Sequence, residues 1–100
     1  MPPYLINPLT LQETAGLQML TVILRQSEDK ARDLLRLKRV HGIILSYPGQ
    51  DRFAFQLYEN GKGFLMEFPN ETTQVCPELI KRLQDLVGKE NIRFEKIVIH

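Results

Sequence analysis

The segment 53–68, FAFQLYENGKGFLMEF, predicts a β-hairpin whose strand register follows from its turn. Asn60 and Gly61 are the preferred pair for a two-residue type I′ turn, because both central residues need positive φ and these two tolerate it. With that turn at the tip, Glu59 lies opposite Lys62 and every other residue of the hairpin has a defined partner. A slip of one residue would turn each side chain to the other face, so the register is strongly specified.

Side chains alternate between the two faces of a strand, so this register divides the hairpin into two unequal faces. One face is apolar and is expected in the core: Phe53, Phe55, Leu57, Phe64, Met66 and Phe68. The other face is mixed: Ala54, Gln56, Tyr58, Leu65 and Glu67. We therefore expect the helices to cover the first face and to leave the second one open.

The chain before the hairpin predicts helices. Met1–Pro8 is rich in proline and is expected to be an extended arm. Thr10 and Glu13 match a capping box, and apolar residues follow at helical spacing: Leu11, Ala15, Met19, Leu20, Ile23 and Leu24. The basic residues of 36–39 are typical of a helix C-terminus. Whether 11–39 forms one helix or two is left open by the ambiguous segment 26–29.

Three further elements are expected outside the hairpin. Residues 42–47 (GIILSY) predict a strand before the turn at 48–51, and an odd loop length, which buries more, leaves Ile44 on the open face. Pro77 and Gly88 mark the start and the stop of a helix. Residues 92–99 predict a last strand, and a β-bulge at Glu95–Lys96 would keep its apolar residues on one face.

The expected order is therefore α-α-β-β-β-α-β, which indicates an α+β fold of two layers. Its four-stranded sheet is expected to be mostly antiparallel, with the helices on one face. A chain of 100 residues is expected to be a single domain, 1–100. Because the last strand enters after a helix it could lie parallel to a neighbour, and its position in the sheet is left open.

Composition and spacing exclude several classes of function. The net charge is +1, and the single cysteine, Cys76, allows no intrachain disulfide and fits a reducing compartment. We find no signal peptide and no apolar stretch that could span a membrane, so a cytoplasmic protein without a membrane partner is expected. Neither His41 nor His100 has metal-ligand spacing with Cys76, and no cofactor is expected. Without a nucleophile and base arrangement, the chain is predicted not to be an enzyme.

Two hypotheses about binding follow. The leading one is a small non-enzymatic protein-interaction or regulatory module, with a homodimer as one form it could take. Its open sheet face is too apolar for a purely solvated surface and too polar for a second core layer. The residues assigned to this face are Ile44, Ala54, Gln56, Tyr58, Leu65 and Glu67.

The alternative is nucleic-acid binding through basic residues in and before the second helical segment: Arg25, Arg32, Arg36, Lys38 and Arg39. On a continuous helix, the four arginines form one stripe that could contact phosphates. The acidic residues Glu28, Asp29 and Asp33 are interleaved with them, which is also typical of an ordinary solvated helix face.

Overall fold

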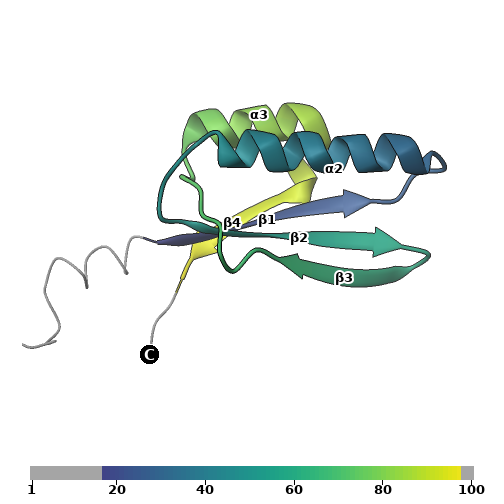
Figure 1. The fold of residues 1–100 in the computed structure, drawn as a ribbon, viewed down its shortest axis with the longest axis horizontal. Coiled ribbons are helices and arrows are strands. Elements are labelled where there is room, and N and C mark those ends of the chain that lie inside the picture. The colour runs from purple at the N-terminus through teal and green to yellow at the C-terminus, as the bar shows by residue number, and fades with distance from the viewer. Residues whose placement is uncertain (1–16, 98–100) are drawn as a thin grey trace, which may run out of the picture.

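The computed structural model describes residues 17–97, and it shows an α+β fold in which two helices lie on one face of a four-stranded sheet (Figure 1). The strands and helices are β1 (Gln18–Arg25), α2 (Lys30–Leu45), β2 (Arg52–Glu59), β3 (Lys62–Glu67), α3 (Pro77–Val87), the short 3-10 helix η1 (Lys89–Asn91) and β4 (Ile92–Lys96). The expected arm at 1–8 and the capping box at Thr10 lie outside the described residues.

The sheet has the order β3-β2-β1-β4, with β1 parallel to β2 and the other two pairs antiparallel. It is therefore mixed, and the expectation of a mostly antiparallel sheet is wrong. The last strand, β4, lies at one edge and is antiparallel to β1, so the idea that it could run parallel to its neighbour is also wrong. The hairpin strand β3 forms the opposite edge.

The first correction concerns residues 18–25, which form the central strand β1 and not a helix. Leu20, Val22 and Leu24 alternate along this strand and are buried against the helices. Ile23, which points to the other face, is also buried. Strands of parallel pairs are often near-continuous apolar runs, and a short run of this kind also satisfies helical spacing. The local pattern therefore could not distinguish the two structures.

The second correction concerns residues 42–45, which continue α2 and do not begin a strand. Asp29 caps the helix by accepting a hydrogen bond from the Arg32 N–H at 3.1 Å. Val40 and Ile44 are fully buried beneath the helix. Packing against the sheet thus overrides the strand preference of the isoleucines. Ile44 is consequently a core residue and does not belong to the open sheet face.

The hairpin prediction is confirmed in its turn and in its register. Asn60 and Gly61 have φ of 54° and 77°, as a type I′ turn requires. The pairs run from Glu59 opposite Lys62 to Ala54 opposite Glu67. The helix that starts at Pro77 and ends before Gly88 is also confirmed, as α3.

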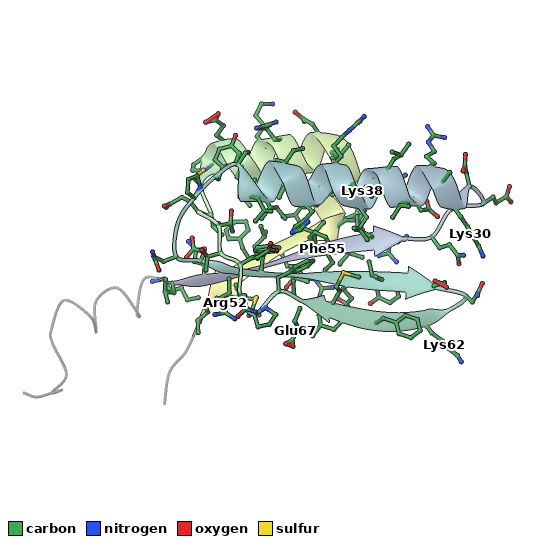
Figure 2. All side chains as sticks on the ribbon, viewed as in Figure 1. Lys30, Lys38, Arg52, Phe55, Lys62 and Glu67 are labelled. Atoms are coloured by element: carbon green, nitrogen blue, oxygen red, sulfur yellow. The ribbon has the colours of Figure 1, made fainter. Side chains whose placement is uncertain are left out.

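The core lies between the sheet and the two helices, and it is centred on β1 and β2. Phe53 and Phe55 of β2 are buried there, and Figure 2 shows Phe55 in the layer between the sheet and the helices, with Glu67 on the far side of the sheet. Phe68 follows β3 and stacks on Phe53 with ring centroids 4.8 Å apart. β4 pairs with β1 in a continuous register from Ile92 to Lys96, so the expected bulge at Glu95–Lys96 is absent from this pairing.

A buried polar link ties the loop before α3 to the rest of the fold. The Asp51 carboxylate accepts hydrogen bonds from the backbone N–H of Gln18 at 2.8 Å and of Val75 at 2.7 Å. Asp51 and Thr73 also exchange two backbone hydrogen bonds, both 2.8 Å long. The buried Thr73 hydroxyl donates to the Ile44 carbonyl at 2.7 Å. The start of β1, the start of β2 and the end of α2 are thereby held together.

Candidate interaction surface

The edge strand β3 exposes three consecutive large apolar side chains. Phe64, Leu65 and Met66 are 53%, 63% and 37% exposed. Phe64 and Met66 lie opposite Leu57 and Phe55, so they face the same side as the buried core. They are nevertheless exposed, from which we infer that the helix layer does not extend over β3. Leu65 points to the opposite side, so both faces of this edge are apolar at its centre.

The two edges of the sheet differ in how they are protected. In β4, IRFEK, the charged residues Arg93, Glu95 and Lys96 surround the exposed Phe94. Charges on an edge strand discourage pairing with another chain. In β3, charges stand only at the two ends, Lys62 and Glu67, and the centre contains no proline and no bulge. The β3 edge is therefore open to another strand.

The backbone groups at this edge can be assigned from the turn. In a two-residue hairpin, Glu59 and Lys62 form a hydrogen-bonded pair, so Lys62, Phe64 and Met66 direct their N–H and C=O groups toward β2. The alternate residues Gly63, Leu65 and Glu67 direct theirs outward. The Tyr58 carbonyl agrees with this assignment, because it points away from β3 and accepts from the Gln26 N–H at 2.9 Å.

The open sheet face brings together five of the six residues that the sequence assigned to it. Ala54 lies opposite Glu67, Gln56 opposite Leu65, and Tyr58 opposite Gly63. Of these, Leu65 is the one large apolar side chain that is mostly exposed. Ala54 is only 4% exposed, so the prediction that it contacts a partner is not supported by its burial. A shallow depression continues from Leu65 across the sheet and is lined on this face by Met19, Thr21, Gln56, Arg93 and Glu95. The sixth residue, Ile44, is buried under α2, as described above.

The exposed row of Phe64 and Met66 is a candidate feature that the sequence analysis missed, since it assigned both residues to the core. The predicted face of the sheet was correct for both residues. The prediction that they are buried was wrong, because burial depends on how far the helix layer extends. The signal that could have found them is the uninterrupted apolar run from 64 to 66 next to a hairpin turn, on a strand that can lie at a sheet edge.

The basic stripe of the alternative hypothesis is only partly present. Arg25 ends β1 and is not helical. Its guanidinium lies over the Tyr58 ring at 5.1 Å, and its Nε donates to Asn91 Oδ1 at 3.3 Å. Arg32, Arg36 and Arg39 do share one face of α2 through their spacing of four and three residues, and Lys38 is exposed on the same helix. Nucleic-acid binding through them stays a prediction.

Residues with chemical potential are dispersed. His41 Nε2 lies 2.8 Å from Glu71 Oε1, and its ring packs 4.8 Å from that of Phe68. Cys76 is a half-buried free thiol at the start of α3. Within residues 17–97, no group of three or more histidine, cysteine, aspartate or glutamate side chains is arranged to hold a metal ion.

A small recess lies where the ends of β1 and β2 meet the first half of α2. It has a volume of about 280 Å³, and its apolar wall includes Leu24, Leu34 and Leu57. Asp33, at its border, accepts hydrogen bonds from the Ser27 N–H at 2.9 Å and hydroxyl at 2.6 Å. These bonds, with the nearby Arg36 and Arg32, lower the pKa of Asp33. The acid in the recess is therefore already engaged in the structure of the loop.

None of the helices formed by residues 17–97 has the length and apolar character needed to cross a membrane. Models of protein families, curated proteins and solved structures were each compared with the chain, and none gives a significant match.

Proposed function

We propose that the chain is a small non-enzymatic protein-interaction module that binds another polypeptide as an added strand along β3. The observation that carries this proposal is the run of exposed apolar residues 64–66 on an unprotected edge strand. Addition of a strand supplies backbone hydrogen bonds for affinity, and the side chains on both faces supply selectivity. The free thiol of Cys76 and the absence of any second cysteine are compatible with work in a reducing compartment such as the cytoplasm.

The energetics favour a reversible complex. Full burial of a leucine, phenylalanine or methionine side chain contributes about 1.5–3 kcal/mol, so the exposed parts of Phe64, Leu65 and Met66 offer about 3 kcal/mol together. Each added backbone hydrogen bond contributes about 0.5–1.5 kcal/mol. Association costs about 4–15 kcal/mol in lost freedom. With about six such bonds, the most favourable balance is about 8 kcal/mol, so we expect micromolar or weaker affinity unless the partner also uses the depression on the open face.

Site-specific photo-crosslinking tests the proposal. A photoreactive amino acid at position 65 is compared with the same amino acid at position 35, because Leu35 is similarly exposed, at 65%, but lies on α2. We expect position 65 in the full chain, expressed in its own host, to form an adduct with a polypeptide, whether a second copy or another protein. Position 35 should form none above background.

Peptide mapping of the adducts decides the outcome. Attachment within an extended segment of the partner supports strand addition at β3. Equal adducts at positions 65 and 35 would indicate non-specific contact, and no adduct at position 65 would show that the edge is unused. Either result contradicts the proposed function.

A further inference from the structure

The outward backbone groups of β3 are complementary to those of a second copy. Gly63, Leu65 and Glu67 alternate along the edge, and a two-fold axis perpendicular to the sheet reverses the strand while keeping each side chain on its own face. We propose that two copies of this chain pair antiparallel through β3, with Leu65 of each copy opposite Leu65 of the other. This inference rests on the proposed function and names the partner of the same edge.

The register follows from counting paired groups. Residues that lie opposite each other must share a face, so the sum of their numbers is even. With Leu65 opposite Leu65, Gly63 pairs with Glu67, and three outward pairs supply about six backbone hydrogen bonds. With Phe64 opposite Phe64, the outward pairs within the two strands are those between Gly63 and Leu65. These two pairs supply about four backbone hydrogen bonds. The first register uses every outward group of β3.

The side chains favour the same register. On the helix side, Phe64 lies opposite Met66 of the other copy, so both exposed apolar groups are covered. On the open side, the two Leu65 side chains meet at the axis. Glu67 lies opposite Gly63, so no like charges face each other. Because the helix layer does not extend over β3, the two sheets can join into one eight-stranded sheet with all helices on one face.

The oligomeric state of the purified chain tests the partner. Sedimentation equilibrium over a range of concentrations should show a monomer–dimer equilibrium for the wild type. L65K places two lysines opposite each other at the axis and should raise the dimer dissociation constant by about 100-fold or more. L35K removes an apolar side chain of similar exposure from α2 and should leave the dissociation constant unchanged. A wild type that is monomeric at every concentration refutes the second copy.

Disulfide trapping tests the register and does not depend on the charge variant. In a C76S background, L65C should form an intermolecular disulfide rapidly under mild oxidation, because the paired Cα atoms would be about 5.5 Å apart. F64C should form it far more slowly, since its opposite residue is Met66. Faster trapping of F64C than of L65C contradicts the register proposed here.

The outcomes separate this inference from the function on which it rests. If the purified chain is monomeric but photo-crosslinking at position 65 captures another protein, the edge is an interaction surface and the second copy is the wrong partner. If neither a dimer nor any adduct is found, both proposals fail.

Discussion

Removal of the Asp51 carboxylate should destabilise the fold more than the loss of any exposed acid. Asp51→Ala leaves the backbone N–H groups of Gln18 and Val75 without their acceptor. A hydrogen bond to a charged group contributes about 1.5–3 kcal/mol, so two such bonds set an upper range of about 3–6 kcal/mol. Both bonds are only partly buried, so water can replace some of this loss, and we expect a decrease of about 3 kcal/mol in the free energy of unfolding.

Urea unfolding followed by circular dichroism measures this loss, at a protein concentration low enough to keep dimers from contributing. Asp51→Asn retains one acceptor oxygen and should lose about half as much. Asp85→Ala is the matched control. It removes a carboxylate that is 70% exposed and that forms a loose surface ion pair with Lys81 at 3.8 Å. The free energy of unfolding should therefore fall by less than about 0.5 kcal/mol. A loss of less than about 1 kcal/mol in Asp51→Ala would refute the role of this carboxylate as a structural link.

Three other perturbations follow from the structure. Gly49→Ala would place a Cβ 2.6 Å from the Thr73 carbonyl oxygen and 2.9 Å from the Gln74 Cα, so the backbone must shift. Thermal denaturation should show a decrease of about 1–3 kcal/mol in the free energy of unfolding, and an unchanged midpoint contradicts this. Phe55→Ala should lower the free energy of unfolding by about 3–5 kcal/mol, because its ring is fully buried. Phe64→Ala should lower it by under about 1 kcal/mol in dilute solution, because its ring is half exposed. Equal losses in denaturant titrations would show that the helix layer also covers β3. The Ser27 hydrogen bonds lower the folded-state pKa of Asp33. The carboxylate therefore stabilises the fold above the pKa of an unfolded aspartate, about 3.9. This stabilisation is lost as the pH falls through the lower folded-state pKa. Asp33→Asn should therefore flatten the acid limb of a stability–pH profile, and an unchanged limb would count against these bonds.

The parts of the fold that the sequence predicted are those with local causes. The Asn60-Gly61 turn sets the hairpin register without help from the rest of the chain. Helix α3 has a proline start, a regular apolar stripe and a glycine stop within its own segment. The predictions for β1 and for the end of α2 were wrong, because the conformation of these segments depends on partners far along the chain. Leu20 lies in register with Phe53, and pairing with β2 on one side and β4 on the other holds residues 18–25 in an extended strand.

The same distinction applies to the candidate site. The face shared by Gln56, Tyr58 and Leu65 was predictable, because strand parity is a local property. Strand parity alone could not predict the exposure of Phe64 and Met66, because this exposure depends on the position of β3 at the sheet edge and on the extent of the helix layer. Ile44 was misplaced because its segment was interpreted as a strand. An edge is a property of the whole sheet, and no residue within β3 encodes it alone.

Amide hydrogen exchange at β3 distinguishes a free edge strand from one that is paired with a second copy. Within one chain, the Phe64 and Met66 amides donate to β2 and should be protected at every protein concentration. Gly63, Leu65 and Glu67 direct their amides outward, so we expect them to exchange freely at about 10 µM and to become protected at about 1 mM, where the dimer forms. If the Leu65 amide exchanges at the same unprotected rate at both concentrations, β3 does not pair with a second copy.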